Sequence, residues 1–122
     1  MNGFAEFWQE RHLCTLTTVR PDGTPHVVPV GATYDLDTGI ARVITSGTSQ
    51  KARIIGEGGA MVALCQVDGR RWSTLEGRAV LRTSPEEVAD AEARYAARYK
   101  PPRANPARVV VEIQVTRILG NV

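Results

Sequence analysis

Residues 60–82 read AMVALCQVDGRRWSTLEGRAVLR, and they predict a β-hairpin. Ala60–Val67 is strongly apolar, and Trp72–Arg82 is the returning strand. Asp68 and Gly69 begin the turn, because both residue types favour tight turns. The tip that follows is cationic and aromatic. This hairpin is the first indication of a mainly β fold.

Four more strands are predicted on either side of this hairpin. Several of their residues are β-branched, which favours strands. Pro21, Asp22 and Gly23 supply a turn between the first two strands. Six strands in so short a chain favour closure into an antiparallel barrel, because closure removes exposed edges. The four strands are Leu13–Val19, Pro25–Tyr34, Ile40–Thr45 and Arg108–Leu119.

Three helices are predicted between the strands. Asn2 can cap a first helix that runs to about Arg11, and Thr48 or Ser49 can cap a second one over SQKARII. A capping box, SPEE, begins at Ser84 and starts a third helix that runs to about Tyr99. No repeat or linker divides the chain, so we expect one domain over residues 1–122.

Composition excludes several classes of protein. The chain has 122 residues, 43% of them hydrophobic and 23% charged, which is typical of a globular protein. No apolar run approaches the roughly 18 residues of a membrane span, and the start does not resemble a secretory signal. We therefore expect a cytoplasmic protein with no membrane partner. A net charge of +2 is too mild for a nucleic-acid binder.

The two cysteines do not indicate a metal site. Cys14 and Cys65 lie in apolar surroundings without CxxC or histidine spacing. We expect no metal and interpret both as buried thiols, with a bridge between them as the lesser alternative. GxSxG, GxGxxG and GxxxxGK[ST] motifs are absent too, so the sequence favours no hydrolase and no familiar nucleotide loop.

The strongest local chemistry lies in residues 46–53, SGTSQKAR. A strand ends there, and a helix begins with unpaired N–H groups that attract anions. Lys51 and Arg53 add positive charge, and the hydroxyls of Thr45, Ser46 and Ser49 complete a possible phosphate cradle. Ordinary helix starts also use serine and threonine, so a purely structural role stays open.

Arginine is the main source of positive charge. All but two of the 15 basic residues are arginine, the exceptions being Lys51 and Lys100. Residues 94–108 contain five basic residues and no acid. This stretch is either a solvated surface or a patch that receives an anionic ligand. Pro29 lacks an N–H, which favours an edge strand, an irregular pairing or a bulge. Gly31 and Ala32 lack side-chain bulk, which indicates either a bend or a backbone bared for a flat ligand.

Several segments, in this order, resemble one family. HVVPVG, ARVIT, GTSQKA, ALCQVDG, RWSTLEGRA and NPARVV are similar to segments of the split β-barrel superfamily of pyridoxamine phosphate oxidases and flavin reductases. Within this FMN-binding fold, the chain resembles the actinobacterial branch that uses the deazaflavin coenzyme F420. Together the segments span nearly the whole chain.

The resemblance implies an activity and an assembly. It implies a homodimer with two cofactors in grooves at the interface. It also implies hydride transfer from reduced F420 to a conjugated acceptor, with reduction of biliverdin to bilirubin as the first expectation. A chain this small cannot enclose such a ligand alone, so a second copy would supply the other wall. Two alternatives stay open: an FMN-dependent oxidase or reductase, and a non-catalytic protein that binds F420 or a tetrapyrrole.

The resemblance also implies roles for particular residues. Ser49, Gln50 and Lys51 would approach the cofactor phosphate, and Pro29–Ala32 would lie near the tricyclic ring. Residues 66–72 and 98–108 would form further walls, partly from the partner subunit. Arg103 or Arg108 would hold the acceptor's propionates, and solvent or an arginine-held water would supply the proton. The expected cofactor-binding residues are Pro29, Val30, Gly31, Ala32, Thr45, Ser46, Ser49, Gln50, Lys51, Gln66, Val67, Asp68, Gly69, Trp72 and Arg98.

Overall fold

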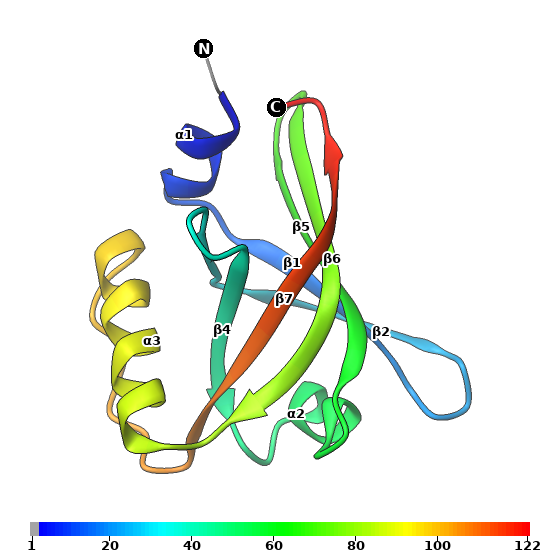
Figure 1. Cartoon of the computed structure of the whole chain (residues 1–122), viewed down its shortest axis with the longest axis vertical. Helices are drawn as coiled ribbons and strands as arrows, with labels where there is room; N and C mark the ends of the chain where they lie inside the picture. The colour runs from blue at the N-terminus through cyan, green and yellow to red at the C-terminus, as the bar shows by residue number, and fades with distance from the viewer. Residues whose placement is uncertain (1–2) are drawn as a thin grey trace.

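Seven antiparallel strands form one sheet in the computed structural model, which describes residues 3–122 (Figure 1). Their spatial order is β2-β1-β5-β6-β7-β4-β3. The longest strands, β5 to β7, lie at the centre, and the shortest lies at an edge. The strands are β1 (Cys14–Val19), β2 (Pro25–Val30), β3 (Thr33–Asp35), β4 (Ile40–Ser46), β5 (Ala60–Asp68), β6 (Arg71–Arg82) and β7 (Arg108–Gly120).

The core lies on one face of this sheet, because buried and exposed residues alternate along the strands. Leu16, Leu64 and Leu75 come from three neighbouring strands, and all are completely buried. Cys14 is also buried, whereas Cys65 is half-buried, and both are free thiols. Cys65 pairs with Thr15, so the two cysteines point to opposite faces and the alternative of a bridge is wrong.

The prediction of one strand over Pro25–Tyr34 is wrong, so the sheet has seven strands and not six. The chain leaves β2 at Val30 and enters β3 at Thr33, and β2 and β3 lie at opposite edges of the sheet. Three peptide steps span at most about 11 Å between α-carbons. The sheet must therefore curl until its two edges nearly meet, although no ladder joins β2 to β3 in residues 3–122.

A gap remains beside this two-residue connection. β2 pairs only with β1. β3 pairs with residues 40–42 of β4, so residues 43–46 have β7 on one side and no described strand on the other. The backbone edge of β2 and the second half of β4 therefore both lack a neighbouring strand, and the candidate site lies between them.

Three helices surround the sheet: α1 (Gly3–Gln9), α2 (Gln50–Ile55) and α3 (Pro85–Arg98). The caps at Ser49 and Ser84 are confirmed, since each hydroxyl accepts a backbone N–H three residues ahead. The predicted Asn2 cap lies outside the described residues. α3 runs alongside β4 in Figure 1, and the connector of residues 99–107 leads from it to β7. No helix in residues 3–122 is long and apolar enough to cross a bilayer.

Candidate functional site

A cavity of about 530 Å³ lies at the gap between β2 and β4. Both strands, the two helices α2 and α3, and the connector contribute to its walls. Six of the residues singled out in the sequence meet here: Pro29, Val30, Gly31, Lys51, Arg103 and Arg108. The cavity is completed by Ile44, Tyr95, Lys100, Pro101 and Pro102.

One wall of the cavity is apolar. Pro29 and Val30 end β2, and Ile44 lies on the free part of β4. Proline suits an edge strand because it has no N–H to donate to a neighbour. The chain therefore breaks its sheet here without leaving an unpaired donor at Pro29, and it presents a surface that can pack against a flat ring.

Lys51 forms a charged part of the opposite wall. It lies in the first turn of α2, and partial burial lowers its pKa from the ordinary lysine value. No carboxylate in residues 3–122 lies within 4.0 Å of its ammonium group. A partly desolvated cation without a counter-charge is costly, and a bound anion would relieve that cost.

The three predicted hydroxyls, those of Thr45, Ser46 and Ser49, do not line the cavity and form hydrogen bonds close to Lys51 in the chain. Thr45 Oγ1 donates to Ser49 Oγ over 3.1 Å, and Ser49 Oγ also accepts from the backbone N–H of Ala52. Asn105 Nδ2 donates to Ser46 Oγ over 2.9 Å. These bonds hold the segment that leads into α2, the helix that carries Lys51. The neighbouring Gln50 is exposed.

The connector supplies most of the remaining charge. Lys100 and Arg103 line the cavity, and neither forms an ion pair with any residue that the structure describes. Arg108 differs, because its Nη1 lies 2.7 Å from Glu92 Oε2 and only 10% of its side chain is exposed. Arg108 therefore already has a counter-charge, which leaves Arg103 as the available arginine of the two predicted to hold an acceptor.

Tyr95 occupies the space that glycine leaves open. A β-carbon on Gly31 would lie 2.7 Å from Tyr95 Cε2, so this ring packs directly on the bared backbone. Tyr95 and Tyr99 lie one turn apart on α3, with ring centroids 4.9 Å apart. Sequence reasoning missed Tyr95 and Ile44. Two tyrosines at helical spacing just before a basic connector were the available signal for Tyr95.

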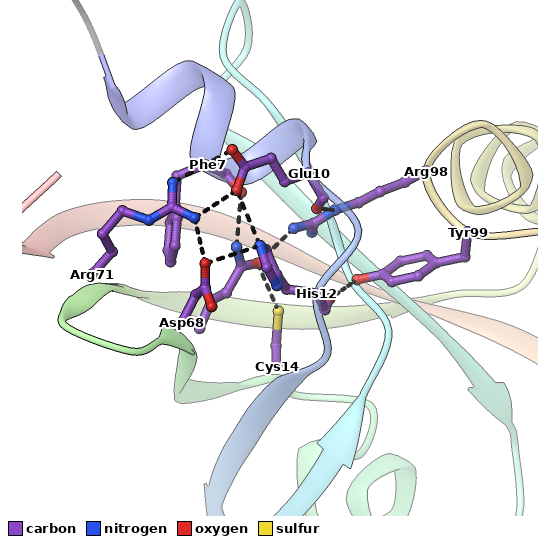
Figure 2. Close-up of polar contacts among 9 residues, drawn as sticks. Phe7, Glu10, His12, Cys14, Asp68, Arg71, Arg98 and Tyr99 are labelled. Atoms are coloured by element: carbon purple, nitrogen blue, oxygen red, sulfur yellow. Dashed lines mark hydrogen bonds and ion pairs between the residues drawn. The ribbon is translucent and has the colours of Figure 1, made fainter.

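Arg98 and Gln66, both predicted at the cofactor, hold elements together. Figure 2 shows Arg98 beside Tyr99. Arg98 donates from Nε to the carbonyl of Glu10 over 2.8 Å, from Nη1 to the carbonyl of Ala32 over 2.6 Å, and from Nη2 to Gln66 Oε1 over 2.5 Å. Gln66 Nε2 donates to the carbonyl of Phe7 over 2.7 Å. Neither side chain lines the 530 Å³ cavity.

Ala32 and Cys14 belong to the same arrangement. Ala32 is completely buried, and its N–H donates to the Tyr99 hydroxyl, which donates in turn to the carbonyl of His12 over 2.6 Å. The Cys14 thiol faces Gln66 Oε1 at 3.4 Å, and burial raises its pKa to about 11. The end of α3 is thus fastened to the connection between β2 and β3.

Two residues of the hairpin predicted as another wall lie on the exposed face of the sheet. Val67 and Trp72 pair across β5 and β6, and they are 61% and 39% exposed. Asp68 ends β5, and Gly69 begins the turn that leads to β6. None of the four lines the 530 Å³ cavity of this chain. Their role toward a cofactor stays a prediction that requires a second subunit.

Three groups with metal-ligating atoms meet beside this hairpin, as Figure 2 shows. The side-chain ligand atoms of Glu10, His12 and Asp68 lie within 4.8 Å of one another. Arg71 bonds to both carboxylates, and its guanidinium lies 5.0 Å from the centre of the Phe7 ring. Bonds from Arg71 and His12 lower the pKa of Glu10. Arg71 is therefore the cation that this cluster already holds.

Comparison with known proteins identifies the family of this chain. Residues 3–121 match the family model described as pyridoxamine 5'-phosphate oxidase. Over 115 residues the chain is 55% identical to the F420H2-dependent biliverdin reductase of Mycobacterium tuberculosis. The match covers 94% of this chain and 83% of that relative.

Solved structures share the fold. A conserved hypothetical protein from Mycobacterium tuberculosis superposes with a TM-score of 0.81 at 26% identity, covering 98% of this chain and 84% of the other. A structure named F420 reductase superposes with a TM-score of 0.78 at 23% identity, covering 98% of each chain.

Proposed function

The chain belongs to the pyridoxamine 5'-phosphate oxidase family, and on this premise we propose that it is a reductase that uses coenzyme F420. The observation that carries the proposal is 55% identity, over 94% of the chain, to a relative named as an F420H2-dependent biliverdin reductase. We propose biliverdin as the acceptor and bilirubin as the product.

The residues of the cavity fit such a coenzyme. Pro29, Val30 and Ile44 give an apolar wall for a planar ring, and Lys51 offers a cation without a counter-charge to a phosphate. Lys100 and Arg103 extend the positive charge along the connector, which suits an anionic tail. When bound in reduced form, the coenzyme would supply a hydride.

The chain's own contribution is to hold and orient. Binding two partners in one geometry converts an encounter in solution into a local reaction, which can supply a large part of the rate. Arg103 would orient the acceptor through a propionate. The lining of the cavity contains no carboxyl or imidazole group, so we propose that water supplies the proton that accompanies the hydride.

A second copy of the chain would complete the site. Leu13, Val67, Trp72 and Leu119 are 68%, 61%, 39% and 39% exposed. The last three lie on one face of β5, β6 and β7, and Leu13 directly precedes β1. Pro29 pairs with Thr15 and borders the same face, so a partner seated there would adjoin the cavity. We expect this face to become buried in a homodimer of the usual obligate size, about 2,000 Å² or more.

Two binding and turnover experiments test the proposal. F420 and FMN are titrated separately into the purified protein, and we expect tighter binding of F420. Loss of the biliverdin absorption band is then followed anaerobically with reduced F420, and we expect no turnover with NADPH in its place. Tight binding of FMN alone would support the FMN-dependent oxidase or reductase of the same family. Binding of F420 without reduction of any acceptor would indicate a carrier.

Cellular location has its own test. We propose that the protein is cytoplasmic, and fractionation of the producing cells would check this.

A further inference from the structure

A second cavity, of about 250 Å³, lies next to the first. Tyr95 and Lys100 line both cavities, so the two are neighbours across these side chains. The remaining lining of the second cavity comes from the segment between α1 and β1 and from the end of α3. These residues are Arg11, His12, Leu13 and Tyr99.

The second cavity is cationic. Arg11 and Lys100 form no ion pair in the part of the chain that the structure describes, and no carboxylate lines the cavity. The nearest acid in the sequence, Glu10, is bonded to Arg71 and His12. Leu13 adds an apolar surface that is 68% exposed. This combination suits a carboxylate carried on an apolar or flexible chain.

The two tyrosines between the cavities are held differently. The Tyr99 hydroxyl bonds to the backbone of His12 and of Ala32. The Tyr95 hydroxyl has no hydrogen bond to any residue from 3 to 122, and its ring contacts Gly31 and Tyr99. Tyr95 is therefore less restrained than Tyr99, and a turn about its side-chain bonds would join the two cavities.

We propose that the second cavity is a carboxylate subsite of the same ligand groove, and that Tyr95 is the movable wall between the two parts. This inference rests on the proposed function. Because Arg108 is paired with Glu92, the first cavity offers one free arginine, and a further carboxylate requires Arg11 and Lys100. The carboxylate comes either from the coenzyme's glutamate tail or from a second propionate of the acceptor.

A charge-removing double variant distinguishes these sources. In Arg11→Gln/Lys100→Gln we expect the affinity for tailed F420, or the apparent affinity for biliverdin, to fall about tenfold, as loss of a charge-assisted bond implies. Tailless deazaflavin and biliverdin dimethyl ester serve as the uncharged counterparts, and their binding should not change. The arm that responds identifies the source. Arg117→Gln, at an exposed position on β7, is the matched control.

A direct probe tests the subsite independently of any enzymatic activity. Triglutamate is titrated into the 15N-labelled wild type and into the double variant, with amide shifts followed by NMR. We expect saturable shifts around residues 11–13 and 95–100 in the wild type, and their loss in the double variant. Shifts that persist in the double variant, or a loss of affinity equal for charged and uncharged ligands, would overturn the subsite. Triglutamate binding without binding of F420 would instead overturn the proposed function alone.

Discussion

Two groups of cations in this protein differ in what their charges contact. The fastening cations, Arg71 and Arg98, donate to carboxylates, carbonyls and an amide. The cavity cations, Lys51, Lys100 and Arg103, have no acidic partner among the described residues. Residues of one chemical type are therefore structural in one place and available to a ligand in the other.

The largest expected effect is a loss of stability when one of the fastening cations is removed. Arg98→Ala removes three hydrogen bonds and leaves two carbonyls and the Gln66 oxygen without this donor. Hydrogen bonds from a charged group contribute about 1.5–3 kcal/mol each, so we expect a loss of at least about 3 kcal/mol in unfolding free energy. Urea denaturation measures it. Arg103→Ala, the control, should change stability by less than about 0.5 kcal/mol, and an equal loss in both variants would contradict the distinction.

The next effect lies on the cavity side. Lys51→Ala should lower the affinity for F420 about tenfold or more, because a charge-assisted bond to phosphate is lost, while the thermal midpoint stays the same or rises. Isothermal titration against Arg53→Ala, at an exposed residue of the same helix, gives the comparison. An unchanged dissociation constant would remove Lys51 from the site.

The pH dependence sharpens this prediction. Burial lowers the pKa of Lys51, so its ammonium loses a proton at a less alkaline pH than an ordinary lysine does. Because the phosphate requires the charged form, binding should weaken as the pH rises through this lowered pKa. The uncharged Lys51→Ala variant should lack this decline.

A smaller effect on stability is expected at Gly31, where the β2–β3 connection meets the cavity wall. In Gly31→Ala, the new β-carbon would meet the Tyr95 ring, so the ring must shift from its place in the cavity wall. Overpacking of this kind costs about 1–3 kcal/mol. Thermal denaturation should show the loss, and Gly31→Ala/Tyr95→Ala should cost less than the two single changes added together. Strict additivity would mean that the two residues do not contact each other.

The smallest expected effect concerns the two cysteine thiols, which differ in burial. At pH 8 an alkylating reagent should modify the half-buried Cys65 and leave Cys14 unmodified, since burial raises the pKa of Cys14 to about 11 from 9.0. The folded state disfavours the thiolate, so this contribution to stability is complete below pH 9 and declines between pH 9 and about 11. Mass spectrometry of peptides identifies the modified residue, and labelling of Cys14 in native protein would contradict the packing.

The sequence predicts the regular elements well because their signals are local. The capping box at Ser84 and the apolar strand over residues 60–67 both appear in the structure close to their predicted bounds. The break at Gly31 and Ala32 was missed because two small residues can continue a strand as well as end it. Only the pairing of β2 with β1 and of β3 with β4 separates them.

The candidate site divides in the same way. Lys51 was predicted from the start of a helix after a strand, and Arg103 from a basic stretch without an acid. In the structure both line the cavity and neither has a described ion-pair partner. Gln66 and Arg98 also looked available for a ligand, but they lie 32 residues apart and bond to each other. No local pattern contains such a contact, so the sequence does not reveal that these two side chains hold distant elements together.

The short connection between β2 and β3 also has a consequence for folding kinetics. The two outermost strands of the sheet are neighbours in the chain, but β1 pairs with β5 and β4 pairs with β7, which are far away in sequence. Pairings of high sequence separation form slowly because long loops must close first. We expect the β5–β6 hairpin to form early, and the two edges to dock late and together. The ligand cavity would then be the last part of the protein to assemble.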